Sequence, residues 1–449
     1  MPSSELLSTE EPSARALVIA IQTPFQTDNE VSSSLDELRQ LMRGLGIPVE
    51  ASVVQRRHDN RDLRVLGSGK LEEVQALLGT GATDAEETET ESETETESES
   101  ENERPWLVVF DGELSPGQQR SLAQTLDVEV VDRTQVILSV FQRRARTRIA
   151  QIEIDLASLE YEAPRIRDQK SLLAQQSGGG GRGGKGHTGA ELKKQELRRR
   201  MSALRTELEQ AQRAQQTRRQ RRQQVERVAL VGYTNAGKSS WMRLLTGGDA
   251  YVEDALFATL DTTVRALSPA SSPRVVVADT VGFLRNLPNH LLASFRSTLD
   301  EALDADLLLV VVDASDPEWQ SQLEVTRQVL ADVGGESIPS LVVLNKTDRL
   351  SPEAVAECQA IVPDSIVAST RDSDSPGRVR QAIIEALDAQ RELAELHVPY
   401  QAGALFGSIH LGAHVLAERF DEAGATLELR ARAEFIAAWK KQIGAREST

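Results

Sequence analysis

The sequence contains a single cysteine, Cys358, in 449 residues. One cysteine excludes a disulfide framework and any metal site built from several cysteine ligands. Long apolar runs are also missing: the longest falls within Ala305–Val312, far short of the roughly 20 residues that span a bilayer. The first residues, MPSSELLSTEEPS, are polar and acidic and do not resemble a signal peptide. We therefore expect a soluble cytoplasmic protein with no membrane role.

Basic residues are too few to balance the acidic ones, and the formal net charge is −18. Much of the excess lies between Asp84 and Glu103, in a tract that contains ETETESETETESES. Such a tract has no apolar surface to bury, so we expect a disordered, solvated loop over about 82–104. A functional acidic tail is the alternative. Residues 1–14 are also expected to be disordered.

The amino-terminal part, residues 1–148, alternates apolar stretches with helix-like ones. This alternation predicts a small parallel α/β domain. The strand-like stretches are Leu17–Ile21, Ala51–Gln55, Trp106–Phe110 and Val128–Val131. The helix-like stretches are Leu35–Leu45, Leu71–Leu78, Leu114–Leu126 and one that starts at Thr134.

Residues 149–224 change to a heptad-like period. Ile149, Ile152, Leu156 and Leu159 share one spacing, and so do Leu197, Met201, Leu204, Leu208 and Ala211. Two such helices joined by a loop predict an antiparallel coiled-coil hairpin, and two helices packed on the α/β core are the alternative. The loop, Ser177–Gly189, carries cations among glycines, and RRQRRQQ ends the second helix. A flexible linker and a phosphate-backbone contact are both open for the loop.

The most informative stretch is VALVGYTNAGKSS. An apolar strand, Val228–Val231, ends at Gly232, and the G-x-x-x-x-G-K-[ST] pattern is completed by Gly237, Lys238 and Ser239. We expect a helix from Lys238. The backbone N–H groups of such a loop cradle phosphates, the lysine reaches the β- and γ-phosphates, and the hydroxyl holds Mg²⁺.

Two later motifs predict a GTPase. Asp279, at the end of a strand, can position Mg²⁺ through water, and Gly282 can offer its N–H to the γ-phosphate. Asn345–Asp348 reads NKTD, and the Asp348 carboxylate can accept from guanine N1–H and the 2-amino group together. Adenine would leave that carboxylate unpaired, which favours strong rejection. A strand at Ile366–Val367 would precede a base-supporting loop.

The chain resembles the HflX GTPases of the Obg–HflX group over nearly its whole length. The resemblance rests on GYTNAGKSS (232–240), LFATLDTTVR (256–265) and DTVGFLRNLP (279–288), which resemble the phosphate loop and the two switches. In the amino half it rests on FDGELSPGQQRSL (110–122) and VVDRTQVILSVFQRRARTR (130–148). It implies a P-loop GTPase domain over 225–391. After it, alternating apolar residues at Leu411–Val415 and Ala425–Leu429 and a closing segment, Phe435–Trp439, predict a small α+β domain of unassigned role over 392–449.

The resemblance implies that Thr259 binds Mg²⁺ and closes over it only with the γ-phosphate present, with Thr262 and Thr263 as rival candidates. Together, motifs and resemblance predict GTP-binding residues Gly232, Tyr233, Thr234, Asn235, Ala236, Gly237, Lys238, Ser239, Phe257, Ala258, Thr259, Leu260, Asp261, Asp279, Thr280, Val281, Gly282, Asn345, Lys346, Thr347, Asp348, Ala368, Ser369 and Thr370. The catalytic candidates are Lys238, Thr259, Gly282 and Asn235, and the Mg²⁺ candidates are Ser239, Thr259 and, through water, Asp279.

Phe283 stands where Ras-like proteins place a water-orienting glutamine. Phenylalanine cannot orient water by hydrogen bonding, so hydrolysis is slow alone or another group assists. Asn235 resembles the asparagine that helps related GTPases bind K⁺ near the phosphates, which would supply positive charge.

The family associates with the large ribosomal subunit, so the resemblance implies contact between the hairpin, its loop and ribosomal RNA. We expect a monomeric GTP-hydrolysing switch in protein synthesis, ribosome rescue or splitting, or ribosome biogenesis. The alternatives are an RNA-remodelling enzyme that uses ATP through its amino half, and a GTP-gated assembly factor with negligible turnover.

Overall fold

The computed structural model describes residues 7, 14–58, 65–79, 105–166, 189–220, 225–248, 257, 263–285 and 302–447. Two compact units divide the chain, one built mainly on residues up to Glu209 and the other on the described residues from Gln210 onward. The acidic tract and all of the glycine-rich loop except Gly189 lie outside the described residues. No helix in the described part has the length and apolar content needed to cross a membrane.

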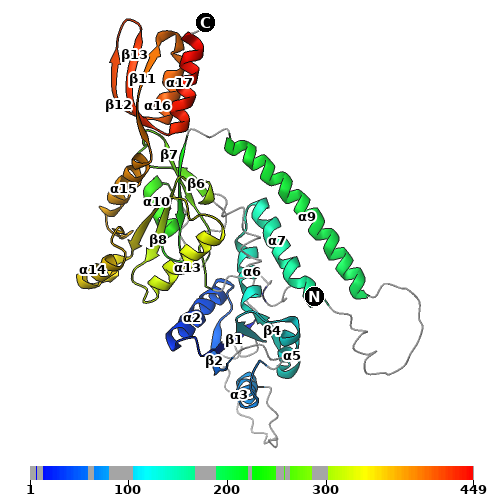
Figure 1. The fold of residues 1–449 in the computed structure, drawn as a ribbon. Helices are drawn as coiled ribbons and strands as arrows, with labels where there is room; N and C mark the ends of the chain where they lie inside the picture. Colours follow the sequence, from blue (N-terminus) through cyan, green and yellow to red (C-terminus); the bar gives the residue numbers. More distant parts are fainter. Residues whose placement is uncertain are drawn as a thin grey trace, which may run out of the picture. The chain divides into compact units, whose positions relative to one another are not determined.

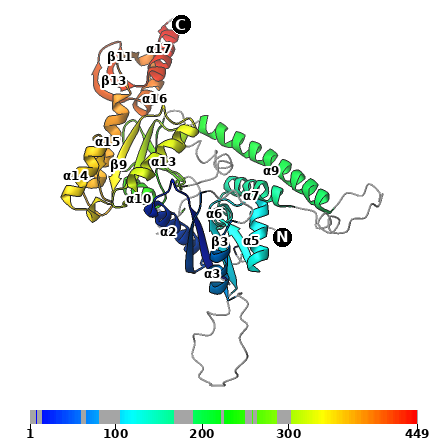
Figure 2. The ribbon, with the colours of Figure 1, turned by 60° about the horizontal axis from the view of Figure 1, so that its bottom comes forward.

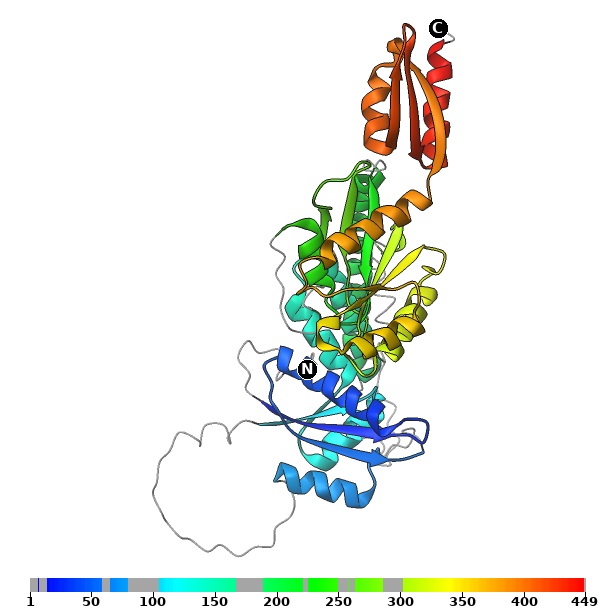
Figure 3. The ribbon, with the colours of Figure 1, turned by 90° about the vertical axis from the view of Figure 1, so that its left-hand side faces the viewer.

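A four-stranded parallel sheet forms the centre of the amino-terminal domain, with strand order β2-β1-β3-β4. Helices α2 and α6 cover one face and α3 and α5 the other, as Figure 3 shows for α2 and α3. The expected parallel α/β class is confirmed. Its elements are β1 (Arg15–Gln22), α2 (Asp28–Gly44), β2 (Val49–Arg56), α3 (Ser68–Leu78), β3 (Trp106–Asp111), α5 (Pro116–Leu126), β4 (Glu129–Asp132) and α6 (Arg133–Arg144).

Helix α2 begins seven residues before the expected Leu35. Thr27 caps it: its hydroxyl accepts from Glu30 N–H, and Glu30 in turn accepts from Thr27 N–H. Such a capping box stabilises the first turn although that turn is not apolar. Of residues 1–14, for which disorder is expected, the structure describes only Leu7 and Ala14, and both are buried. The carbonyl oxygen of Leu7 accepts from Arg143 Nη2.

Two helices follow, α7 (Arg148–Glu162) and the long α9 (Gly189–Gln220), which lie side by side in Figures 1 and 2. Their seam buries Ile152, Leu156 and Leu159 against Leu204, with the heptad residues Leu197, Met201 and Leu208 beside them. Ion pairs from Arg148 to Glu207 and from Arg200 to Asp155 flank the seam in antiparallel register. The helices therefore pair as an antiparallel hairpin. The alternative, in which the helices pack on the α/β core, also holds in part, because α7 packs on α6 of the α/β domain.

The second unit begins with a six-stranded sheet of order β10-β9-β8-β5-β7-β6, parallel except for β6. Helices α10 and α15 bury Trp241, Met242, Val379 and Ile383 against this sheet. The elements are β5 (Glu226–Val231), α10 (Lys238–Thr246), β6 (Thr263–Ala266), β7 (Val275–Asp279), β8 (Leu307–Asp313), α13 (Trp319–Asp332), β9 (Ser340–Asn345), η2 (Thr347–Arg349), α14 (Pro352–Ile361), β10 (Ile366–Val367) and α15 (Ser375–Ala389).

An antiparallel sheet of order β11-β13-β12 follows, with α16 and α17 on one face (Figure 1). The alternating apolar residues of Leu411–Val415 belong partly to a helix, since α16 ends at Gly412. The elements are β11 (Glu392–Pro399), η3 (Tyr400–Ala402), α16 (Ala404–Gly412), β12 (His414–Phe420), β13 (Gly424–Ala431) and α17 (Ala433–Glu447).

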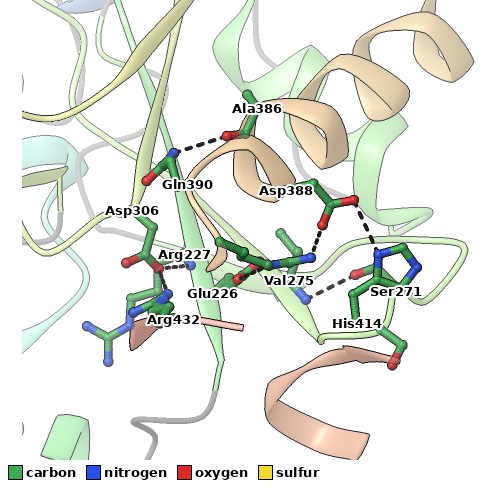
Figure 4. A network of polar contacts seen from close by, with 12 residues as sticks. Glu226, Arg227, Ser271, Val275, Asp306, Ala386, Asp388, Gln390, His414 and Arg432 are labelled. Atoms are coloured by element: carbon green, nitrogen blue, oxygen red, sulfur yellow. Dashed lines mark hydrogen bonds and ion pairs between the residues drawn. The ribbon is translucent and has the colours of Figure 1, made fainter. Parts of the chain in front are cut away.

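Charged side chains join this last domain to the amino ends of β5 and β8 (Figure 4). Arg391, between α15 and β11, donates from Nε and Nη2 to Glu226 at 2.9 and 2.5 Å, and both side chains are buried. Arg391 also contacts Asp388, whose other oxygen lies 3.3 Å from His414 Nδ1. A second link joins Arg432 to Asp306.

Candidate functional site

The phosphate loop, residues 232–239, joins β5 to α10. Gly232 has a φ of +143°, and a Cβ on it would lie 2.2 Å from the carbonyl oxygen of Val311. Gly237 has a φ of +102°, and a Cβ there would lie 2.3 Å from Asn345 Nδ2. Both positions therefore require glycine. Helix α10 begins at Lys238, as expected.

Lys238 is folded back onto its own loop. Its Nζ donates to the carbonyl oxygens of Gly232 at 3.1 Å and Tyr233 at 2.8 Å. Burial lowers the pKa of Lys238 to about 8, and the charge of Asp279 opposes this shift. The ammonium is thus held by carbonyl groups that phosphate oxygens can replace.

Ser239 and Asp279 converge from α10 and β7. The Ser239 hydroxyl donates to Asp279 Oδ2 at 2.8 Å, and Asp279 is 3% exposed. Thr280, fully buried, donates to the carbonyl oxygen of Leu230 and fastens this strand end to β5. A hydroxyl and a carboxylate are hard oxygen ligands, so the pair fits the Mg²⁺ that GTPases generally use.

The residues after β7 run along the phosphate loop. Phe283 N–H donates to Gly232 O at 3.1 Å, and Thr234 N–H donates to Phe283 O at 2.8 Å. Val281 and the Phe283 side chain are buried, the latter at 2% exposure. Phe283 therefore contributes its backbone to this edge and its ring to the core.

The NKTD residues lie beside the phosphate loop. Asn345 Nδ2 donates to Ala236 O at 2.7 Å, and Lys346 Nζ donates to Asn235 O at 2.9 Å. Lys346 also pairs with Asp313 at 2.6 Å. These bonds tie the base motif to the phosphate loop through two side chains.

Asp348 and the loop after β10 also meet. Ser369 Oγ donates to Asp348 Oδ1 at 2.5 Å, and Thr347 Oγ1 donates to Ala368 O at 3.0 Å. Thr370 is half-buried and follows Ser369 directly. A carboxylate held this way can accept two donors from one edge of a guanine base.

Only part of the first switch can be placed. Phe257 is 3% exposed with a φ of +56°, whereas Ala258, Thr259, Leu260, Asp261 and Thr262 lie outside the described residues. Thr263, the other rival to Thr259, is exposed and pairs with Asp279 across β6 and β7.

Sequence reasoning missed several polar partners. Asp313 ends β8 and pairs with Lys346. A carboxylate directly after a run of apolar residues is the sequence signal that could have identified Asp313 as a site residue. Buried Ser375 accepts from Ser369 N–H and donates to Asp372 at 2.6 Å, and no local pattern marks it. No cluster of three or more histidine, cysteine or acidic residues suited to a metal occurs in the described part.

Three family models match the chain. One is described as the N-terminal region of a GTP-binding GTPase (residues 32–142), one as the middle region of a GTP-binding GTPase (144–222), and one as a 50S ribosome-binding GTPase (227–346). A GTPase HflX from Gluconacetobacter diazotrophicus is 43% identical over 98% of this chain and 100% of its own length. The chain belongs to the HflX family of GTPases. It is a P-loop enzyme that hydrolyses GTP.

A second HflX GTPase and a solved structure also match the chain. The GTPase of Caldanaerobacter subterraneus is 34% identical over 94% of this chain and 91% of its own length. Among solved structures, a GTP-binding protein from the archaeon Sulfolobus solfataricus in complex with GDP is 20% identical. It aligns over 83% of this chain and 98% of that chain, with a TM-score of 0.42.

Proposed function

We propose that this HflX GTPase is a cytoplasmic, monomeric switch that binds the large ribosomal subunit in its GTP state and leaves after hydrolysis. The 50S ribosome-binding description of the matched GTPase region supports the partner. The observation that carries the proposal is the helical hairpin: the part of α9 nearest the glycine-rich loop exposes Lys193, Lys194, Arg198, Arg199 and Arg200. This stretch carries five cations against two exposed acids, Glu191 and Glu196, and such a cationic excess on a chain of net charge −18 favours a phosphate backbone as partner.

In the proposed cycle, Asp348 selects guanine with support from Ser369, while Asn345 and Lys346 hold the base motif against the phosphate loop. Lys238 turns from its carbonyl partners to the β- and γ-phosphates. Ser239 and Asp279 would hold Mg²⁺, which neutralises phosphate charge when bound. Thr259 and Gly282 would respond to the γ-phosphate, so that the GTP state favours docking.

Co-sedimentation with separated subunits tests the partner. The protein should pellet with large subunits in a non-hydrolysable GTP analogue and much less in GDP, at one stated salt concentration because phosphate contacts are salt-dependent. Reversing Arg198 and Arg199 to Glu should abolish pelleting. The matched control reverses Lys440 and Lys441 on α17, which are equally exposed. Equal pelleting of both double variants would contradict a role for the hairpin.

Asn235 supports a further proposal, that K⁺ binds near the phosphates and speeds hydrolysis. Asn235 has a left-handed φ of +60° and lies at the exposed bend of the loop. GTP hydrolysis should be faster in K⁺ than in Na⁺, and Asn235→Ala should remove the difference. Equal rates for the unaltered protein would sink the idea.

A second candidate function is ATP use by the amino half. A cavity of about 580 Å³ opens beside Gln22, Thr27, Arg56, Arg57 and His58, at the carboxyl ends of β1 and β2. ATP binding that persists in a Lys238→Ala variant would favour it, and loss of ATP binding together with GTP binding would count against it.

A further inference from the structure

The second switch is fastened to the phosphate loop by side chains as well as by backbone. Arg285 N–H donates to the Tyr233 hydroxyl at 2.8 Å. The Arg285 guanidinium then reaches Glu318, the N-cap residue of α13, at 3.0 Å. These bonds add to the two backbone bonds of Phe283.

This fastening brings Gly282 against Lys238. A Cβ on Gly282 would lie 2.8 Å from Lys238 Nζ and 2.9 Å from Thr234 Cα. The γ-phosphate of GTP must fit between the lysine ammonium and the backbone of this glycine. The observed spacing leaves no width for a phosphoryl group there, whereas the β-phosphate needs only the loop itself.

Tyr233 and Glu318 are suited to control this closed arrangement. Tyr233 is 7% exposed, so its hydroxyl bond to Arg285 is shielded from water. The Arg285 and Glu318 side chains are 13% and 23% exposed, so their ion pair is partly desolvated. Both contacts act on one residue, immediately beyond the segment that must move.

We propose that Tyr233 and Glu318 are positioning residues that set the preference between GTP and GDP. Together they hold Arg285 and keep the second switch closed on the phosphate loop. GTP binding then has to break these contacts, while GDP binding leaves them intact. The device disfavours GTP relative to GDP and returns the switch to its closed position once phosphate has left. It concerns the isolated protein and does not depend on the ribosomal partner.

Two single variants test the proposal. Tyr233→Phe removes only the hydroxyl acceptor, and Glu318→Gln removes only the charge that holds Arg285. We expect Tyr233→Phe to lower the ratio of the Kd for a non-hydrolysable GTP analogue to the Kd for GDP by about two- to tenfold, the effect of one hydrogen bond. Glu318→Gln should shift the ratio in the same direction by less, because the pair is partly solvated. The double variant should change the Kd ratio by less than the product of the two single fold-changes, since both contacts hold one segment.

Matched controls separate this role from a general structural one. Tyr400→Phe removes a hydroxyl that donates to Asp421 O, far along the chain, and Glu324→Gln removes an exposed charge on the same helix α13. Both should leave the ratio unchanged. If Tyr233→Phe and Glu318→Gln weaken or strengthen both nucleotides equally, or raise the ratio, the proposal is overturned. Thermal unfolding midpoints of all five variants, the double included, identify any that have lost their fold.

Discussion

The Ser369 hydroxyl donates a 2.5 Å hydrogen bond to the Asp348 carboxylate, across the end of the GTPase sheet. Arg371 Nη1 lies 3.5 Å from the other carboxylate oxygen. The carboxylate is thus held in place before any base arrives, which reduces the ordering cost of recognition. Under the proposed role of Asp348, the choice of base depends on this one side chain and on the residues that hold it.

Asp348→Asn should therefore change which base binds. The asparagine amide oxygen can still accept from the Ser369 hydroxyl. The amide NH₂ group, however, would face the N1–H and 2-amino groups of guanine, which are also donors. Affinity for GTP should fall by about 10²-fold or more, and affinity for XTP should rise, because xanthine carries a carbonyl oxygen in place of the 2-amino group. Competition binding with both nucleotides measures the change. Asp332→Asn, an exposed change on α13, should alter neither affinity.

Phe283→Gln tests whether a glutamine at position 283 is enough to orient water and speed GTP hydrolysis. The ring is 2% exposed and its backbone is already paired with the phosphate loop, so a glutamine side chain would enter the core. We expect no gain in GTP hydrolysis and a loss of about 2–5 kcal/mol in stability. Val264→Gln, on a side chain that is 44% exposed, should cost far less. A faster single-turnover rate in Phe283→Gln would show instead that the side chain reaches the nucleotide.

Much of this site could be predicted from sequence because the local pattern carries its own geometry. Gly232 and Gly237 must be glycine because each has a positive φ and a close neighbour where a Cβ would lie. The apolar strand before Gly232 is visible in the sequence. The class of the amino-terminal domain was equally accessible, since buried strands alternate with amphipathic helices.

Contacts between distant segments could not be predicted. Tyr233 and Arg285 are 52 residues apart, and Glu226 and Arg391 are 165 apart. No period or motif links such pairs, because they meet only when the sheet assembles. The early start of α2 was missed for a different reason: Thr27 and Glu30 stabilise a polar first turn that periodicity does not register.

The buried pair of Glu226 and Arg391 should matter greatly for stability. Arg391→Met leaves the Glu226 carboxylate buried without its partner, which typically costs about 3–5 kcal/mol. The double variant Glu226→Leu with Arg391→Met should recover most of the loss, because the buried Glu226 carboxylate is removed as well and only the more exposed Asp388 loses its contact with Arg391. Urea unfolding midpoints measure both. Arg148→Met, which breaks an exposed pair with Glu207, should move the midpoint much less, and an equal shift would argue against burial as the cause.

Nucleotide affinity should depend on pH through Lys238, whose pKa burial lowers to about 8 from 10.5. In the free protein, the unfolded chain binds a proton that the folded chain does not between pH 10.5 and 8. Stability is therefore lost as pH falls through this window and changes no further below it.

Phosphate oxygens favour the charged ammonium, so nucleotide binding raises this pKa and takes up a proton above pH 8. GDP affinity should level off below pH 8 and fall by up to about tenfold per pH unit above it. Titration calorimetry in EDTA, with two buffers of different ionisation enthalpy, measures both the affinity and the proton uptake. Because guanine itself loses its N1 proton in alkaline solution, Lys238→Met serves as the control. This variant should bind GDP more weakly, and the pH dependence that remains should come from guanine alone. If the affinity of the variant falls with pH as steeply as that of the unaltered protein, Lys238 is not the cause.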